Sequence, residues 1–161
     1  MRIIGIDPGL QKTGWGIIDD ELSRFKYVSH GVISTSTKDD IPKRLDDIFK
    51  NIQEIIKEYK PQHASVEEIF LNNNPKSTIK LSMARGIAIL APKNLGLDVF
   101  EYTANKVKKN VVGSGHAGKE QVAHMVMRLI NNCPSVSNDA ADALAIALCH
   151  AHSFKFYSKT A

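Results

Sequence analysis

The chain has 161 residues, a formal net charge of +4 and a charged fraction of 24%. This size and balance are typical of a globular chain that buries a core of its own, and they exclude an intrinsically disordered protein. We expect a single domain over residues 1–161, with a short tail after about residue 153.

The N-terminal apolar run is interrupted by Asp7 and Pro8, so it is too short for a secretion signal or a membrane span. The two cysteines, Cys133 and Cys149, have no metal-ligand spacing. This pattern favours buried thiols in a reducing compartment. We therefore expect a cytoplasmic protein that does not bind membranes.

The first elements in the chain are predicted to be three strands. Runs rich in β-branched and aromatic residues predict strands at 2–6, 14–18 and 25–33, and short connections containing Gly, Asp and Ser favour an antiparallel arrangement. Apolar residues at helical spacing then predict an amphipathic helix at 41–56, which Pro61 ends.

The next elements alternate between strand and helix before the pattern becomes entirely helical. A strand at 63–70, a helix at 77–91 and a strand at 97–102 are followed by helices at 104–109, 119–130 and 139–150. This order predicts an α/β fold with a mixed five-stranded sheet. Three antiparallel strands are followed by two parallel ones, and helices flank the sheet.

Several carboxylate residues are predicted at the edge of the sheet where ligands usually bind. Asp7 ends the first strand and Glu67 or Glu68 ends the fourth, and ligands usually bind at the carboxyl ends of parallel strands. Strand alternation lets only one of the two glutamates join Asp7. Asp139 and Asp142 are three residues apart and share a helix face, although acids at a helix start also stabilise the helix dipole.

A carboxylate cluster without thiolates suits Mg²⁺ or Mn²⁺. Two such ions about 3.5–4 Å apart can activate a water on one side of a phosphodiester and stabilise the leaving oxygen on the other. Residues 71–119 carry eight Lys and Arg against Asp98 and Glu101. That surface suits a polyphosphate, although a solvated helix face has the same composition. Together these features predict a metal-dependent nuclease.

Five segments resemble the bacterial branch of the RuvC family of Holliday-junction resolvases. They are GIDPGLQKTGWGIID, VEEIF, ARGIAI, FEYTANKVKKNVVGSGHAGKEQV and DAADALAIALCHAH, and the resemblance extends from Met1 to about His152. The sequences of actin-like ATPases begin with a similar GIDPG motif, but such an enzyme needs two lobes around a nucleotide, and 161 residues are too few for both. The sequence also has no glycine-rich P-loop for binding nucleotide phosphates.

The resemblance implies an RNase H-like fold and a crossover junction endodeoxyribonuclease, which resolves four-way DNA junctions by paired, Mg²⁺-dependent nicks in recombination and repair. It also implies a homodimer that works with RuvA and RuvB. The family's acidic tetrad falls on Asp7, Glu67, Asp139 and Asp142, which are expected to hold two Mg²⁺ ions per active site.

The resemblance also indicates DNA contacts. Lys108 and Lys119 match lysines implicated in activity, and either could contact phosphate or stabilise charge on the scissile group. Phe70 matches an aromatic residue used against bases near the crossover, where stacking contributes about 1–3 kcal/mol per base; a core position is the alternative. Further junction contacts are expected from Lys76, Lys80, Arg85, Lys106 and Lys109.

Small residues in the helix at 77–91 permit close packing across a subunit boundary; these are Ser82, Ala84, Gly86 and Ala88. His150 and His152 lie two to three turns from Asp142, so we expect them to be structural. The alternative functions are an RNase H-like nuclease that acts on RNA or on another branched substrate, and a non-catalytic junction-binding module.

Overall fold

The computed structural model describes residues 1–21, 24–69 and 75–160, and side chains up to residue 154. This part of the chain forms six strands and five helices. In chain order they are β1 (Arg2–Asp7), β2 (Lys12–Glu21), β3 (Arg24–Ser34), α1 (Ile41–Tyr59), β4 (His63–Glu68), α2 (Pro75–Asn94), β5 (Asp98–Thr103), α3 (Ala104–Val112), α4 (Lys119–Leu129), β6 (Ile130–Asn131) and α5 (Asn138–Thr160). None of these described helices is both long and apolar enough to cross a membrane.

The strands form one mixed sheet in the order β5-β4-β1-β2-β3-β6. As predicted, β1, β2 and β3 are antiparallel, and β4 and β5 run parallel to β1. The predicted count of five strands is wrong by one, because Ile130 and Asn131 pair with Phe25 and Lys26 at the edge of β3. Two residues directly after a helix carry no periodic pattern, so periodicity could not reveal this strand.

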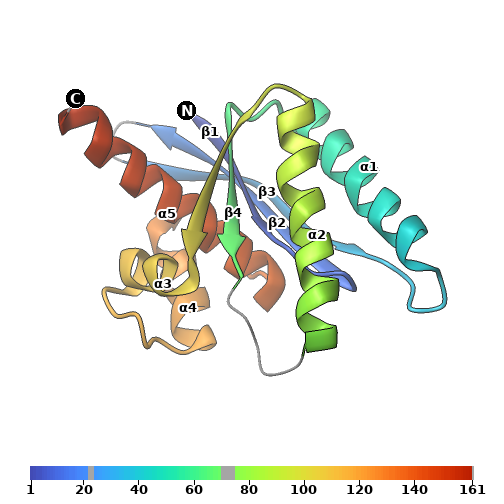
Figure 1. Cartoon of the computed structure of the whole chain (residues 1–161). Helices are drawn as coiled ribbons and strands as arrows, with labels where there is room; N and C mark the ends of the chain where they lie inside the picture. Colours follow the sequence, from blue (N-terminus) through green and yellow to red (C-terminus); the bar gives the residue numbers. More distant parts are fainter. Residues whose placement is uncertain (22–23, 70–74, 161) are drawn as a thin grey trace.

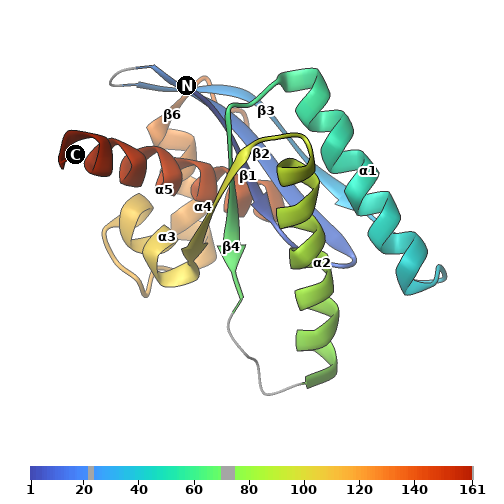
Figure 2. The ribbon, with the colours of Figure 1, turned by 45° about the horizontal axis from the view of Figure 1, so that its top comes forward.

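Helices cover both faces of the sheet (Figures 1 and 2). On one face, Ile48 and Ile52 of α1 pack with Ile4 and Ile6 of β1, and α2 adds buried alanines. On the other face lie α3, α4 and α5, whose buried residues pack with Ile3 of β1. The alternation of Ile3, Ile4 and Ile6 between the two cores follows from the two-residue period of a strand.

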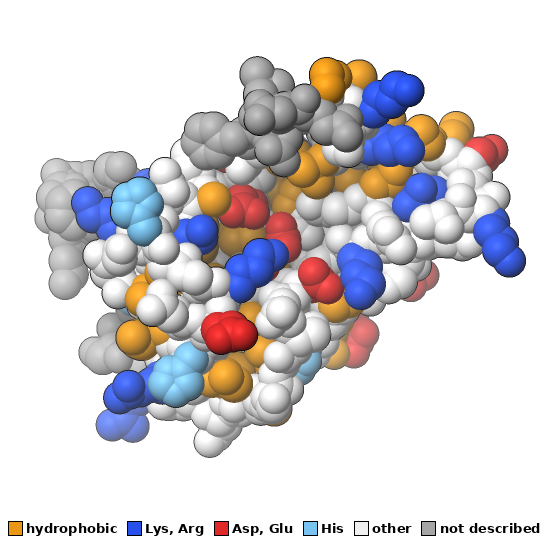
Figure 3. All heavy atoms as spheres, turned by 90° about the horizontal axis from the view of Figure 1, so that it is seen from below, with side chains coloured by type: hydrophobic (Ala, Val, Ile, Leu, Met, Phe, Trp, Pro, Cys, Tyr) orange, Lys and Arg blue, Asp and Glu red, His pale blue; other side chains and the backbone are white. Residues whose placement is uncertain are grey.

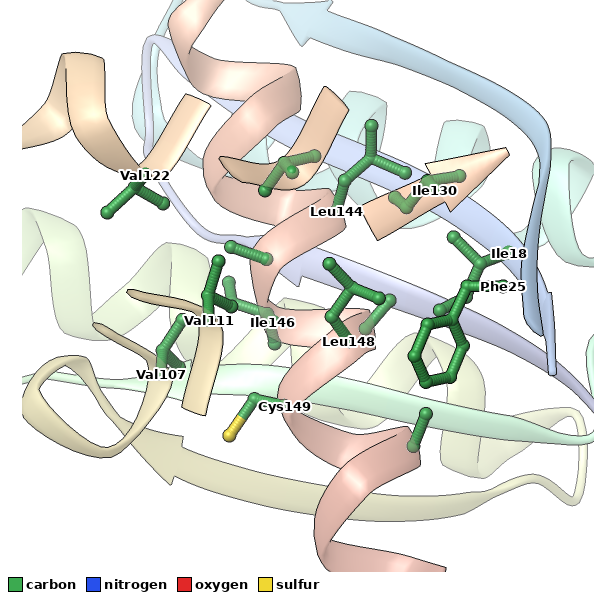
Figure 4. Packing of buried hydrophobic residues seen from close by; sticks show 14 of the residues in the cluster. Ile18, Phe25, Val107, Val111, Val122, Ile130, Leu144, Ile146, Leu148 and Cys149 are labelled. Carbon is green, nitrogen blue, oxygen red and sulfur yellow. The ribbon is translucent and has the colours of Figure 1, made fainter. Parts of the chain in front are cut away.

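The second core is organised around α5. Figure 4 shows aliphatic side chains of α5 lying between the sheet and the helices α3 and α4. The contributing residues are Leu144, Ile146 and Leu148 from α5, Val107 and Val111 from α3, Val122 from α4, Ile130 from β6, and Ile18 and Phe25 from the sheet. Burial of each large aliphatic side chain contributes about 1.5–3 kcal/mol, which holds α5 firmly on the sheet.

Glycines in the sheet allow α5 to approach very closely. A Cβ atom on Gly5 would lie 2.0 Å from the backbone oxygen of Ala143, and one on Gly14 would lie 2.2 Å from that of Asp139. Contacts this short are impossible for a real side chain. The first turns of α5 therefore rest directly on β1 and β2, next to Asp7, whose register partner is Gly14.

The structure extends one predicted helix and corrects the interpretation of another. The helix predicted at 139–150 continues as α5 to Thr160. Ala84 and Ala88 are fully buried in the core shared with α1, so they pack within the chain rather than across a subunit boundary. Ser82 and Gly86 are exposed.

Candidate active site

An open pocket of about 270 Å³ lies where β1 and β4 end beside the start of α5. Its acidic side chains are Asp7, Glu67 and Asp142. Figure 3 looks onto this end of the molecule and shows Asp and Glu side chains near the centre, with Lys and Arg side chains around them. Folding therefore brings together three carboxylates from distant parts of the sequence.

Strand geometry explains why these acids meet. Ile6 and Val66 are register partners in β1 and β4, and both are buried on the side covered by α1 and α2. The residues that follow them, Asp7 and Glu67, therefore point together toward the opposite side. Asp142 reaches the same place from α5, which covers that side of the sheet.

All three carboxyl groups hold a proton more strongly than usual. The pKa of Asp7 is raised to about 8, first by burial and then by the charges of Glu67 and Asp142. Burial also raises the pKa of Glu67 and that of Asp142. The charge of Asp142 adds to the effect of burial on the pKa of Glu67. The site thus concentrates more negative charge than its own side chains neutralise.

Two lysines supply the positive charge of the pocket. Lys108 comes from α3 and Lys119 begins α4. The Nζ atom of Lys119 lies 3.5 Å from Oδ2 of Asp142, and the charges of both lysines lower the pKa of Asp142 against the effect of burial. The side chain of Lys119 is still 73% exposed, so it is free to turn toward an anion that enters the pocket.

The rest of the pocket wall is apolar and was missed by the sequence analysis. It consists of Ala104, Val107, Val122, Ala145 and Ile146. In the sequence these residues look like ordinary core positions at helical spacing, and no local signal marks them as part of a site. Their contribution is physical, because an apolar wall lowers the local dielectric constant and strengthens every charge interaction inside the pocket.

The fourth predicted acid, Asp139, stands slightly apart. It lies one turn before Asp142 on α5 and is not among the described residues that line the pocket, although its charge raises the pKa of Asp142. Glu68 borders a neighbouring pocket on the α2 side instead. Of the two glutamates left open by the sequence, Glu67 is the one that lines the acidic pocket together with Asp7.

Comparison with known families identifies the chain. The family model described as crossover junction endodeoxyribonuclease RuvC matches residues 3–150. The chain belongs to the RuvC family. It is 50% identical over 153 residues to the RuvC of Citrifermentans bemidjiense, covering 95% of this chain and 93% of that one. It is 48% identical over 150 residues to the RuvC of Bartonella quintana, covering 93% and 89%.

A solved structure of a RuvC family member has the same architecture. T. thermophilus RuvC, in complex with Holliday junction substrate, superposes with a TM-score of 0.91 at 30% identity, over 98% of this chain and 97% of that one. The predicted RNase H-like fold is therefore confirmed, apart from the additional short strand β6.

The acidic pocket of this RuvC family member suits a divalent cation. Its donors are carboxylate oxygens, which Mg²⁺ and Mn²⁺ prefer, and the raised pKa values show that their negative charge is not compensated. Among the described residues, no three or more His, Cys, Asp and Glu side chains are already grouped as a metal cage. Mg²⁺ usually takes one or two carboxylates and completes its shell with water and substrate phosphate.

Apart from Lys108 and Lys119, the predicted DNA-binding residues that the structure describes are not in the pocket lining. Lys76 and Lys80 are exposed on α2, and Lys109 is exposed on α3. Lys106 is also exposed, and its Nζ atom stands 4.8 Å above the centre of the Tyr102 ring. Arg85 is different, because it forms an ion pair with Glu101 of β5. Phe70 lies outside the described residues.

His150 and His152 are not part of the pocket lining, as expected. His150 is fully buried, and both of its ring nitrogens are bonded, one to His63 at 2.9 Å and one to the Tyr102 hydroxyl at 2.8 Å. His152 packs edge-on against Phe25. The two cysteines form no disulfide; Cys149 is buried, as predicted, and Cys133 is half-buried.

Proposed function

We propose that this protein is an endonuclease that resolves Holliday junctions by divalent-metal-dependent hydrolysis of phosphodiester bonds. The observation that carries the proposal is the single pocket in which Asp7, Glu67 and Asp142 face Lys108 and Lys119. The membership of the chain in the RuvC family agrees with it. Such a pocket combines metal-binding acids with groups that hold a polyanion.

Asp7, Glu67 and Asp142 are the proposed metal ligands, with Asp139 as the fourth. We propose two Mg²⁺ ions per active site, for which Mn²⁺ can substitute. When bound, these ions supply activated water and stabilise the leaving oxygen. Asp7 lines the pocket together with both Glu67 and Asp142, so it would hold a bound metal ion with either of them.

The chain's own contribution is to orient and neutralise the phosphate. The Nζ atom of Lys119 lies 3.5 Å from the carboxylate of Asp142, and both residues line the pocket. A phosphate that enters can replace this carboxylate as the partner of Lys119. Lys108, which is less exposed, faces the pocket from α3. Either lysine then stabilises the negative charge that grows on the scissile group.

The proposed DNA surface extends on both sides of the pocket. Each Lys or Arg that neutralises a phosphate releases counterions, so exposed basic residues add affinity without sequence preference. We propose this role for Lys76, Lys80, Lys106 and Lys109, and base stacking near the crossover for Phe70. Arg85 is a weaker candidate, because its partner Glu101 already neutralises it.

We further propose that the protein is a homodimer joined through α2. The exposed face of α2 carries Ile79, Met83 and Leu90, which are 55%, 41% and 54% exposed, with Gly86 between them. Their spacing of four, three and four residues matches the apolar seam of two packed helices. A Cβ atom on Gly86 would meet nothing within 4 Å, so this face is open to a second copy. A dimer would hold two active sites for paired nicks.

Two broader elements of the resemblance complete the proposal. We propose that residues 1–161 act as one nuclease domain, and that RuvA and RuvB deliver the junction to it. In a bacterial cell, an enzyme that acts on DNA works in the cytoplasm, and we propose that compartment.

One assay tests the proposed function. Purified protein is incubated with a mobile four-way DNA junction, a linear duplex, a single strand and an RNA-containing branched substrate, with and without Mg²⁺. We expect Mg²⁺-dependent paired nicks in the four-way junction alone. Cleavage of the RNA substrate in preference to the junction would favour the alternative nuclease, and junction binding without any cleavage would favour a non-catalytic module.

A further inference from the structure

The buried histidine of α5 joins three elements of the fold. His150 is completely inaccessible to solvent. Its Nε2 atom lies 2.9 Å from Nδ1 of His63 at the start of β4, and its Nδ1 atom lies 2.8 Å from the hydroxyl of Tyr102 on β5. One helix and two strands are therefore linked through a single imidazole ring, which has no part in the proposed reaction or in the proposed DNA contacts.

The elements linked at His150 are those that carry most of the acidic pocket. Tyr102 is the register partner of Glu67, and α3, which bears Lys108, begins two residues after Tyr102. Asp142 lies eight residues before His150 on α5, which is about 12 Å along a helix axis. The pocket lining takes Glu67 from β4, three residues from α3 and three from α5. A shift of His150 against either strand would therefore change the shape of the pocket.

Hydrogen bonds fix what apolar packing leaves free. Glycines of β1 and β2 set how closely α5 approaches the sheet, but aliphatic contacts are non-directional and do not define how the helix is rotated. Hydrogen bonds weaken steeply away from their preferred angle. In the described sheet, β5 is an edge strand that pairs with β4. The bond between His150 and Tyr102 therefore also fixes the end of this edge strand, and with it the start of α3.

The imidazole of His150 is held in one state. Burial and the nearby His63 lower the pKa of His150 to about 4, so at pH 7 the ring is neutral, with one donor and one acceptor nitrogen. Both nitrogens are bonded, and the rings of Phe100 and Phe154 lie 4.4 Å and 5.5 Å from it, measured between ring centroids. The ring cannot turn over without breaking its bonds. A fully bonded buried network of this kind rigidifies the elements that it joins.

We propose that His150 is a positioning residue for the acidic pocket. Its hydrogen bonds to Tyr102 and His63 fix where α5 and the start of α3 stand relative to β4. The side chains whose separation is set in this way are Asp142, Glu67 and Lys108. His150 is buried and is not part of the pocket lining, so it acts through these residues. The inference rests on the proposed function and deepens it, since a misplacement of about 1 Å can slow a reaction about 100-fold.

The test compares variants that break these bonds. Tyr102→Phe removes the hydroxyl that bonds to Nδ1 of His150 and keeps the aromatic ring beneath Lys106, whereas His150→Phe removes both bonds. We expect each variant to slow single-turnover junction cleavage by at least about tenfold at saturating protein and Mg²⁺. Calorimetry is expected to show Mn²⁺ binding to the DNA-free protein weakened by at least about threefold, because the acids no longer keep their spacing.

Two further measurements distinguish positioning from a lost DNA contact. The Kd for the junction without metal is expected to change by less than about twofold, because no phosphate contact is altered. The double variant is expected to cleave at the rate of His150→Phe alone, because Tyr102→Phe breaks a bond that His150→Phe has already removed. A loss of junction affinity without a change in the saturated rate, or losses that simply multiply in the double variant, would overturn the inference.

Matched controls separate positioning from a general loss of stability. Tyr59→Phe removes a phenol hydroxyl that accepts a hydrogen bond from Ser29 at 3.1 Å. His152→Phe changes the next histidine of α5, which packs against Phe25. Neither is expected to alter the rate constant or the Mn²⁺ affinity, and a rate constant at saturating protein does not depend on the fraction that is folded.

The outcomes have separate meanings. Rate constants and Mn²⁺ affinities equal to those of the parent in Tyr102→Phe and His150→Phe overturn the inference. An equal loss in Tyr59→Phe or His152→Phe overturns it as well, because the effect would then not depend on the bonds of His150. A parent protein that binds no Mn²⁺ or cuts no junction overturns the proposed function instead.

Discussion

Asp7 and Glu67 line one pocket where the neighbouring parallel strands β1 and β4 end. Two ionised carboxylates repel each other at this position, so a proton on one of them is favoured. The pKa of Asp7, raised to about 8 by burial and by its acidic neighbours, expresses the same fact. A bound cation would offset this repulsion.

Replacing Asp7 tests its assignment as a metal ligand. We expect Asp7→Asn to lower Mg²⁺-dependent junction cleavage by at least about 100-fold, because a charged ligand is lost at the reacting centre. Junction binding is expected to persist or strengthen, because a negative charge that faces DNA phosphate is removed. Gel-shift and cleavage assays measure both. Asp46→Asn, on the exposed surface of α1, is the control and should behave as the parent. Undiminished cleavage by Asp7→Asn contradicts the assignment.

The raised pKa of Asp7 also predicts how stability depends on pH without metal. The pKa is about 3.8 in the unfolded chain and about 8 in the folded one, so the folded state binds more protons between these values. The contribution of Asp7 to stability is therefore fully present below pH 4 and is lost as the pH rises through 8. Asp7→Asn is expected to melt about 2–6 °C above the parent at pH 9 and close to it at pH 5. An equal difference at both pH values would show that Asp7 does not titrate in this range.

The close seating of α5 on β2 gives a prediction about geometry. Gly14→Ala would place a Cβ atom 2.2 Å from the backbone oxygen of Asp139, so the start of α5 must shift away from β2. We expect a loss of about 1–3 kcal/mol in stability and at least about tenfold slower cleavage, because Asp142 moves with the helix. Gly115→Ala is the comparison, since its added Cβ has no neighbour nearer than 3.7 Å. Full activity of Gly14→Ala would mean that this spacing is not needed.

The buried His150 predicts a pH dependence of the opposite sign. Burial and the nearby His63 lower the pKa of His150 to about 4, so the unfolded chain binds more protons between pH 6.5 and pH 4. The stabilising effect of His150 is present above pH 6.5 and is lost as the pH falls toward 4. His150→Phe leaves the Tyr102 hydroxyl and His63 without this partner, so we expect it to be about 2–3 kcal/mol less stable at pH 7.5. Denaturant titrations should show this difference shrinking toward pH 4; a difference that is constant with pH would contradict the role of His150.

The apolar stripe on α2 predicts a change in oligomeric state. Met83→Glu places a charge in the middle of the proposed seam, and we expect sedimentation to show a monomer that nicks junctions singly rather than in pairs. Because Met83 is exposed, the stability of each chain should change by less than about 0.5 kcal/mol. Met127→Glu, at an exposed methionine of α4, is expected to leave the dimer intact. A dimer that tolerates Met83→Glu as well as Met127→Glu would exclude α2 as the interface.

Local patterns were enough to predict most of the fold. Strand alternation and helical spacing are set by neighbouring residues, so β1 to β5 and the helices fall close to their predicted places. The strand β6 was missed because two residues have no period, and its pairing with Phe25 and Lys26 depends on a distant segment. The C-terminal end of α5 was also missed. The helix continues to Thr160, and the sequence contains no signal that fixes where it ends.

The sequence by itself determined which residue types carry the chemistry: acids after two buried strands and at the start of an alanine-rich helix, and lysines in the segment between them. Only the tertiary structure decided which of these residues meet. Glu67, and not Glu68, lines the acidic pocket with Asp7, whose pKa it raises. Asp139 is not part of the pocket lining. Arg85 forms an ion pair with Glu101. The physical reason is that a side chain's partner depends on register, helix seating and burial, which are properties of elements packed together and not of any one segment.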